Sequence, residues 1–286
     1  MAEKRLTKEI AEQFLADEDS VNLNEFTEVD DDAAEILSKY EGEWGLLLDG
    51  LTSLSDAAAE SLSKQKGELS LYGLTSLSDE AAYSLSKHEG GLGLSGLTSL
   101  SDIAAFCLSK HEGWLYLTGL KSLSDTAAES FSKHKGYCLE LNGLTSLSDA
   151  AAESLSKHEG DELSLNGLTS LSDAAAESLS KHDGYLDLNG LTSLSDAAAE
   201  SLGKHKGGLE LNGVTSLSDV AAESLSKLDG YLDLSGLTSL SDAAAESLGE
   251  YRGRGLKLDP YNLPASAAEI LRQHPRVDWS SRRPSS

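Results

Sequence analysis

The residues of this chain that could do chemistry recur at a nearly fixed spacing. Histidines form one series, aspartates form a second, and acidic and aromatic residues flank a repeated Leu-x-Leu segment. Imidazoles in a row could hold a transition metal, and carboxylates in a row could hold calcium. Aromatic rings beside carboxylates on one surface are the ingredients of a recognition site. Each series therefore predicts a different function.

The histidine series falls near the ends of expected helices. Other copies of the same sequence unit hold Tyr40, Gln65, Leu228 and Tyr251 at this place. A position that accepts Leu and Tyr indicates packing near a helix end, where His also suits the helix dipole, and a metal site needs geometry as well as identity. We therefore expect no metal here. The series is His88, His111, His134, His158, His182, His205 and His274.

The aspartate series follows a serine at each expected helix start. No second oxygen ligand recurs beside it with the spacing of a calcium loop, so we expect helix capping, in which the oxygen of either the serine or the aspartate can accept from the free amides of the helix start. The chain also shows no nucleophile–base pairing and no phosphate-binding loop. We predict a protein that is not an enzyme, with no catalytic residue, metal or cofactor. The series is Asp56, Asp79, Asp102, Asp125, Asp149, Asp173, Asp196, Asp219 and Asp242.

A strand and a helix make up each repeated unit. In one copy Leu186 and Leu188 alternate with polar residues, which is typical of a short strand with one buried face. Ala198 and Leu202 follow at helical spacing on one stripe. Gly207, like its equivalent in the other copies, is expected to end the helix in a left-handed conformation.

The unit recurs every 23 or 24 residues along most of the chain. A fixed period of this length predicts a solenoid, in which stacked units share one core. We predict an α/β fold: a solenoid in which the short strands stack into one parallel sheet and the helices pack beside it. Residues 1–20 are expected to form an N-terminal capping helix and 275–286 a flexible tail. Residues 21–274 form the solenoid, with nine regular repeats between degenerate first and last units, the first strand being 21–23.

The Leu-x-Leu strand followed by Leu-Ser-Asp-x-Ala-Ala-x-x-Leu resembles the leucine-rich repeat family. Within it the chain looks most similar to the cysteine-containing subtype, with repeats of about 23 residues over 21–274. The family's Asn or Cys after the strand is Leu here, as at Leu191, or Val, as at Val214. The resemblance implies a right-handed β-α solenoid shaped like a horseshoe, with short parallel strands on the concave face, helices on the convex face, and a role in protein recognition.

Composition limits the partners. The formal net charge is -25, from 48 acidic and 23 basic residues, which argues against nucleic acid and anionic membranes and favours a basic partner. The acidic residues could equally keep a repeat surface from self-associating. Cys107 and Cys138 have neither a metal spacing nor a disulfide framework, so we expect reduced thiols. No apolar run could span a membrane, and the N-terminus lacks a signal-peptide core, so we expect a cytoplasmic protein.

The positions beside the strand leucines vary most between copies. This favours a non-catalytic binding module or scaffold that recognises a protein or peptide, monomeric or weakly self-associating, through the concave face. A structural, self-associating role and carbohydrate binding on the concave aromatics stay open as alternatives. The expected apolar anchors are Trp114, Tyr116, Tyr185 and Tyr231, and the carboxylates expected to select a basic segment are Glu140, Asp187, Glu210 and Asp233.

Overall fold

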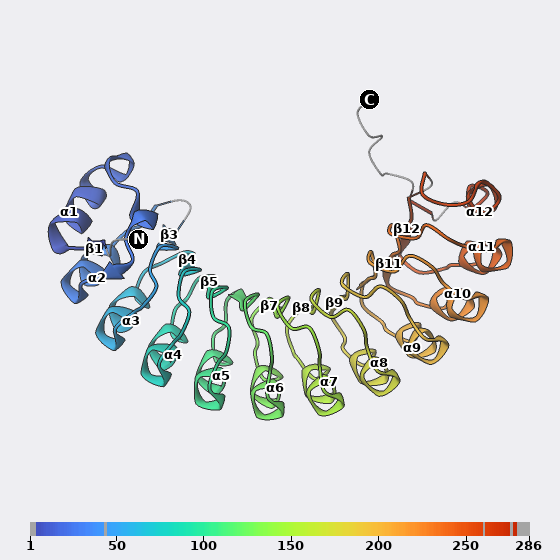
Figure 1. The fold of residues 1–286 in the computed structure, drawn as a ribbon, viewed down its shortest axis with the longest axis horizontal. Coiled ribbons are helices and arrows are strands. Elements are labelled where there is room, and N and C mark those ends of the chain that lie inside the picture. Colours follow the sequence, from blue (N-terminus) through green and yellow to red (C-terminus); the bar gives the residue numbers. More distant parts are fainter. Residues whose placement is uncertain (1–3, 43–44, 260, 275–276, 279–286) are drawn as a thin grey trace. The chain divides into compact units, whose positions relative to one another are not determined.

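A computed structural model of the chain describes residues 4–42, 45–259, 261–274 and 277–278. The chain forms two compact units. Unit 1 contains residues 1–144 and 158–160, and unit 2 contains residues 145–157 and 161–286. Each unit is a stack of strand–turn–helix repeats, with its strands on one side and its helices on the other (Figure 1). The predicted α/β solenoid architecture is confirmed.

Unit 1 holds two parallel sheets. Strands β1 and β2 pair with each other, and β3 to β7 pair in chain order. The strands are β1 Arg5–Leu6, β2 Glu28–Val29, β3 Leu46–Leu47, β4 Leu69–Ser70, β5 Leu92–Gly93, β6 Leu115–Tyr116 and β7 Cys138–Glu140. The helices are α1 Lys8–Ala16, α2 Asp31–Leu37, α3 Asp56–Leu62, α4 Asp79–Leu85, α5 Asp102–Leu108 and α6 Asp125–Phe131, with 3-10 turns η1 Glu18–Ser20 and η2 Leu23–Glu25.

Unit 2 repeats the same arrangement with strands β8 to β13 in chain order. The strands are β8 Glu162–Ser164, β9 Tyr185–Asp187, β10 Leu209–Glu210, β11 Tyr231–Asp233, β12 Gly255–Lys257 and β13 Val277–Asp278. The helices are α7 Asp149–Leu155, α8 Asp173–Leu179, α9 Asp196–Leu202, α10 Asp219–Leu225, α11 Asp242–Gly249 and α12 Ala265–Leu271.

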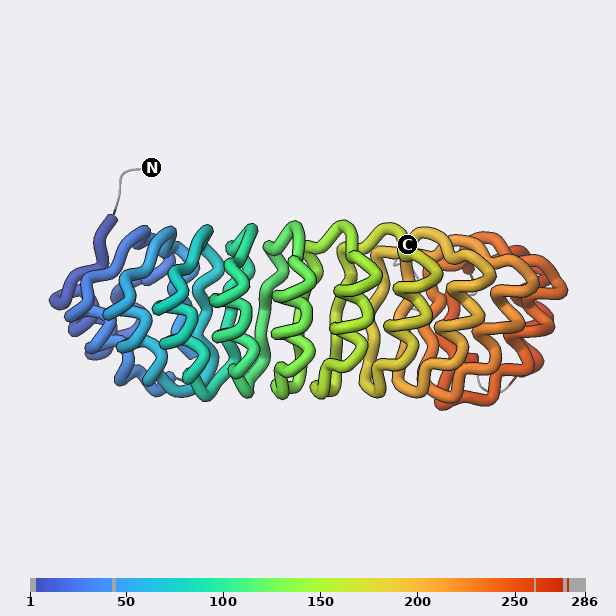
Figure 2. The backbone as a smooth tube through the Cα atoms, turned by 90° about the horizontal axis from the view of Figure 1, so that it is seen from below, coloured from blue at the N-terminus to red at the C-terminus, as the bar shows by residue number. Residues whose placement is uncertain are grey.

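The core of each unit consists of leucines from the strands and alanines from the helices. In one repeat Leu69, Leu71 and Leu74 of the strand and turn, and Ala81 and Leu85 of α4, are all 0% exposed. The alanines are small, so the helices pack close to the sheet. Because successive repeats place these residues in register, successive turns of the backbone run side by side within each unit (Figure 2).

The serine before each aspartate is the helix cap, and the aspartate has a different role. Ser195 accepts a hydrogen bond from the Ala198 amide at 3.0 Å, as an N-cap does. Its own hydroxyl donates to Asp173 of the preceding repeat at 2.5 Å. Of the two caps that the sequence allowed, the serine is therefore confirmed and the aspartate is wrong, because the carboxylate joins neighbouring repeats.

These serine–aspartate bonds form a ladder along the helix starts of each unit. In every described rung the hydroxyl donates to the carboxylate one repeat earlier. The rungs in unit 1 are Ser55–Asp31, Ser78–Asp56, Ser101–Asp79 and Ser124–Asp102, and those in unit 2 are Ser172–Asp149, Ser195–Asp173, Ser218–Asp196 and Ser241–Asp219.

The glycine after each helix permits close packing of backbones. Among the described residues, positive φ occurs only at Gly45 (75°) and Gly67 (93°). At Gly207 a Cβ atom would collide with the carbonyl oxygen of Gly184 in the preceding repeat. The prediction that the glycine after each helix is left-handed therefore holds at Gly67 and is wrong at its described equivalents. The helices end at a right-handed residue such as Ser86 (φ -61°, ψ -16°).

The two ends of the chain differ from the sequence-based picture. The strand expected at 21–23 is absent; the Asn22 side chain accepts from the Asn24 amide at 3.1 Å, which favours the 3-10 turn η2. The N-terminal segment contributes β1 as well as helix α1, and β1 pairs with β2. Two residues of the expected tail, Val277 and Asp278, form β13 beside β12. The remainder of that tail lies outside the described residues.

Candidate interaction surface

The strands of each unit bring their variable side chains into one row on the outer side of the sheet. In unit 1 the parallel register places Gly93 beside Tyr116 and Tyr116 beside Glu140. In unit 2 it places Asp187 beside Ser164 and Glu210. Neighbouring strands lie about 4.8 Å apart, so such side chains act as one surface.

Three aromatic rings form a stack on the sheet of unit 1. The ring centroid of Trp114 lies 4.9 Å from that of Tyr137 and 6.1 Å from that of Tyr116, with both interplanar angles 26°. Trp114 is 40% exposed and Tyr137 is 50% exposed. This stack joins two of the expected anchors, Trp114 and Tyr116, with a residue that we did not select. Tyr137 lies in an insertion before β7. An aromatic residue in that insertion was the feature of the sequence that could have identified it as part of the surface.

Glycines in and beside β5 make room for this aromatic surface. A Cβ atom at Gly91 would lie within 4 Å of Trp114, Tyr116 and Glu68. The ring of Tyr72, itself 40% exposed, covers Gly93 so closely that a Cβ atom there would collide with it. The glycines let the rings lie flat near the backbone, which leaves a broad aromatic face on β5 to β7.

Carboxylates surround the aromatic face. Burial, together with the negative charges of Glu68 and Glu140, raises the pKa of the Tyr116 phenol to about 12. The pKa of Tyr72 is raised by burial and then by the same two glutamates together with Asp49. The face therefore combines exposed rings with a negative potential, which suits a cation lying over the rings.

The sheet of unit 2 gathers three carboxylates on adjacent strands β8 to β10. Burial raises the pKa of Glu162, and the charges of Asp187 and Glu210 add to the shift. Burial also raises the pKa of Asp187, against hydrogen bonds from the Asn189 amide and the Ser164 hydroxyl, both at 2.9 Å. A positive group brought to these strands would relieve their mutual repulsion.

Two of the expected anchors in unit 2 pack on glycines of the next strand. The Tyr185 ring lies against Gly208, where a Cβ atom would collide with it, and Tyr231 lies beside Gly255. The Tyr185 hydroxyl donates to Glu210 at 2.5 Å, and burial followed by this bond raises the pKa of Tyr185. Both tyrosines are half-buried. Tyr185 thus positions Glu210 and covers the backbone at Gly208, which has no side chain of its own.

Asp233 does not face solvent. It is 0% exposed, and Lys257 of the next strand donates to it at 2.7 Å. The Ser235 amide donates to its other oxygen at 2.9 Å. Its charge is paired within unit 2, so a partner cannot reach it, and only Glu140, Asp187 and Glu210 of the four expected carboxylates remain on the surface.

The histidines form a buried stack at the ends of the helices. Ring centroids are 6.2 Å apart for His88 and His111, 6.4 Å for His111 and His134, and 5.4 Å for His134 and His158 in unit 1. In unit 2 His182 and His205 stack at 6.4 Å. Burial lowers the pKa of His111 to about 4 and that of His134 to about 3, with the neighbouring imidazoles adding to both shifts. Neutral stacked rings serve as packing.

Further findings concern the cysteines, metal ions and membranes. Cys107 and Cys138 are buried and form no disulfide. Within residues 4–278, apart from the undescribed positions, no group of three or more His, Cys, Asp or Glu side chains is arranged to hold a metal ion. In the same part of the chain, every helix is too short or too polar to cross a membrane.

Neither a protein-family model nor a curated protein matches this sequence. Among solved structures, the chain is similar to a leucine-rich repeat protein of Leptospira interrogans, with 18% identity, a TM-score of 0.48, and coverage of 96% of this chain and 81% of the other. It is also similar to an internalin of Listeria monocytogenes, with 16% identity, a TM-score of 0.49, and coverage of 91% and 82%.

Proposed function

We propose that this solenoid is a non-catalytic binding scaffold whose sheet surface in unit 1 binds a basic segment of another protein. The observation that carries the proposal is the stack of Trp114 with Tyr116 and Tyr137 on one sheet face, in which the rings of Trp114 and Tyr137 are exposed. Large exposed rings on a fixed frame are typical of residues that dominate binding energy at protein interfaces.

The charge around the rings favours a cationic partner. Glu68 and Glu140 lie close enough to Tyr116 to raise the pKa of its phenol. A lysine or arginine side chain placed over the aromatic face would gain cation–π attraction and the attraction of both carboxylates. The net charge of -25 would also speed the approach of a basic segment.

Unit 2 supports the same preference independently. Its surface carboxylates Glu162, Asp187 and Glu210 lie on adjacent strands, and burial and mutual repulsion raise the pKa values of Glu162 and Asp187. Each unit therefore presents negative charge on its strands. Binding that engages either surface should weaken as salt screens the charges.

A selection experiment tests the proposal. A random displayed peptide library is panned on the full chain, and the selected peptides are measured by fluorescence anisotropy at low and high salt. We expect peptides rich in Arg or Lys. The W114S/Y137S variant should weaken their binding by about tenfold or more, and the E68Q/E140Q variant should flatten the salt dependence. Tyr261→Ser, at a side chain 64% exposed beyond β12, is the matched control.

The outcomes separate the alternatives. Selected peptides without basic residues, or peptides that bind W114S/Y137S as tightly as the native chain, would refute the proposed surface. Carbohydrate binding, which the exposed ring of Trp114 also favours, predicts retention on a glycan array that is lost in W114S/Y137S and unchanged in E68Q/E140Q. A structural role without an external ligand predicts that neither screen yields a binder.

A further inference from the structure

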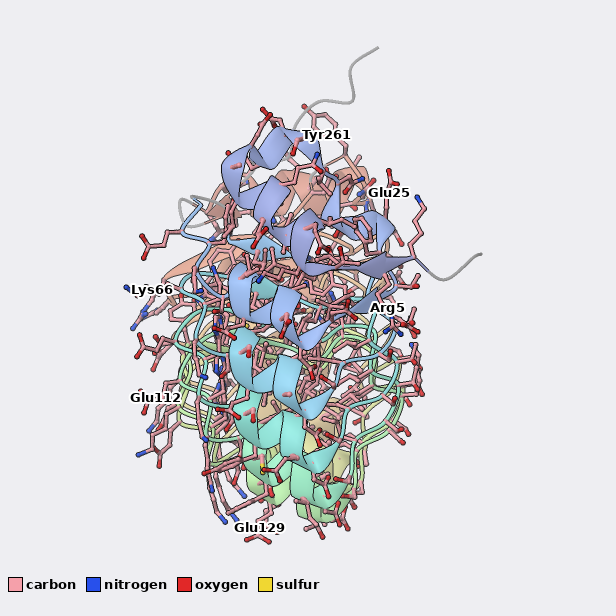
Figure 3. All side chains as sticks on the ribbon, turned by 90° about the vertical axis from the view of Figure 1, so that its left-hand side faces the viewer. Arg5, Glu25, Lys66, Glu112, Glu129 and Tyr261 are labelled. Carbon is pink, nitrogen blue, oxygen red and sulfur yellow. The ribbon has the colours of Figure 1, made fainter. Side chains whose placement is uncertain are left out.

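The outer side of the helix layer carries a repeated ion pair. In most repeats a glutamate near the middle of the helix pairs with a lysine one turn later, at 3.0 to 3.4 Å. Figure 3 shows one such glutamate, Glu129, projecting from the helix layer of unit 1. The pairs are Glu60–Lys64, Glu129–Lys133, Glu153–Lys157, Glu177–Lys181, Glu200–Lys204 and Glu223–Lys227.

Two adjacent helices of unit 1 break this pattern. Tyr83 in α4 and Phe106 in α5 occupy the position of the glutamate, and they are 46% and 49% exposed. Ile103, three residues before Phe106 and hence on the same side of α5, is 59% exposed. We call these three residues the α4–α5 patch. It replaces a charged, solvated surface by apolar side chains on neighbouring repeats.

The lysines of the broken pairs remain. The Nζ atom of Lys87 lies 3.9 Å from the Tyr83 ring centroid, and that of Lys110 lies 4.1 Å from the Phe106 ring centroid. Within the described part of the chain neither lysine forms an ion pair with a carboxylate, unlike their equivalents in the six paired repeats. The patch is therefore apolar in its middle, with Lys87 and Lys110 after the two rings and the exposed carboxylate of Glu80 three residues before Tyr83.

We propose that the α4–α5 patch is a second docking surface, which binds a partner segment with apolar side chains next to carboxylates. The apolar side chains would cover Tyr83, Ile103 and Phe106, and the carboxylates would replace the missing glutamates as partners of Lys87 and Lys110. A basic segment is disfavoured here because it would leave Lys87 and Lys110 without the carboxylate partners that the equivalent lysines have. A second copy of the chain is disfavoured by its net charge of -25.

The chain supplies a fold-compatible variant for the test. Y83E/F106E restores the glutamate found at this position in the paired repeats, so α4 and α5 should fold as those helices do. The displayed peptide library is panned on the W114S/Y137S chain, which removes the sheet surface of unit 1 from the selection. We expect peptides that combine aliphatic or aromatic residues with Asp or Glu, and about a tenfold or greater loss of their binding in Y83E/F106E.

A second variant and a control complete the design. K87Q/K110Q should select apolar peptides that have lost the preference for Asp and Glu. Val220→Glu in α10, at a side chain 54% exposed and equivalent in position to Ile103, should leave binding unchanged. The proposal is overturned by peptides that bind Y83E/F106E normally, by a selection enriched in Lys and Arg, or by a selection that yields no binder. Light scattering that shows a dimer lost in Y83E/F106E would instead assign the patch to self-association.

Discussion

Among single residues, the buried imidazoles should make the stability of the fold depend on pH. His134 is 0% exposed and its pKa is lowered to about 3, whereas the ordinary value is 6.5. In the folded chain this ring stays neutral at pH values where the unfolded chain has already bound a proton. The stabilisation that the packed neutral ring gives the fold is therefore fully present above pH 6.5. This part of the free energy of unfolding is lost as the pH falls toward 3.

Replacement of one imidazole should reduce this acid sensitivity. Leu228 fills the equivalent position in another repeat and is 1% exposed, so His134→Leu has a precedent in the same chain. We expect the free energy of unfolding of His134→Leu to exceed that of the native chain increasingly below pH 6.5, by about 1.4 kcal/mol per pH unit at most. Urea titrations at pH 5 and pH 8 measure the difference.

Gln65→Leu, at the equivalent buried position of another repeat and without a titratable ring, is the control and should change the two titrations alike. If His134→Leu shifts stability equally at both pH values, the imidazole is not kept neutral by burial in the fold.

A second prediction at this scale concerns the buried carboxylate Asp233. Its partner Lys257 has a pKa raised by the hydrogen bond to Asp233. Lys257→Met should cost about 2–3 kcal/mol in urea unfolding, because it leaves a buried charge without its cation. The double variant D233N/K257M should recover part of that loss. A double variant less stable than Lys257→Met would contradict this explanation.

At the scale of elements, the serine–aspartate ladder joins each helix to the one before it. Ser195→Ala removes both the helix cap and one rung, whereas Asp173→Ala removes the rung and the negative charge in the first turn of α8. We expect losses of about 2 kcal/mol and about 1 kcal/mol, respectively, since the rung is exposed to solvent. Guanidinium unfolding of the two variants tests the order. Equal losses would show that the cap contributes no more than that first-turn charge does.

The elements also show what the sequence could predict. The strands and helices were predictable because Leu-x-Leu and Ala-Ala-x-x-Leu recur in register, and each buried position is repeated many times. The role of the aspartates was not predictable, because serine and aspartate are both good helix caps. Which of the two caps the helix depends on contacts with the neighbouring repeat. The left-handed glycines were predicted from a single helix, whereas the contact that requires glycine comes from the backbone of the preceding repeat.

The candidate surface was predictable only in part for the same reason. Trp114 and Tyr116 were recognised from their types, and the structure places them in one aromatic stack. The burial of Asp233 depends on Lys257 in the next strand, which single-unit reasoning did not consider. The α4–α5 patch was detectable as a break in the Glu–Lys spacing, but that spacing becomes informative only once the helices are known to lie side by side.

At the scale of the whole molecule, the net charge of -25 should oppose folding through self-repulsion. We expect the melting temperature to rise when NaCl is raised from about 0.01 M to about 0.15 M, as the Debye length falls from about 30 Å to about 8 Å. The E80Q/E112Q variant, changed at two exposed glutamates, should show a weaker rise. A melting temperature that falls with salt in the native chain would mean that attractive pairs outweigh the repulsion.

The ladder also has a direction, and this affects how such a chain can grow by gene duplication. A repeat with both the hydroxyl and the carboxylate fits between any two others like it, because it donates to the repeat before it and accepts from the repeat after it. Helix α12 begins after Pro264, which has no hydroxyl to donate. New copies that keep the ladder continuous can therefore arise from repeats that carry both groups, whereas a duplicate of the α12 repeat would interrupt it.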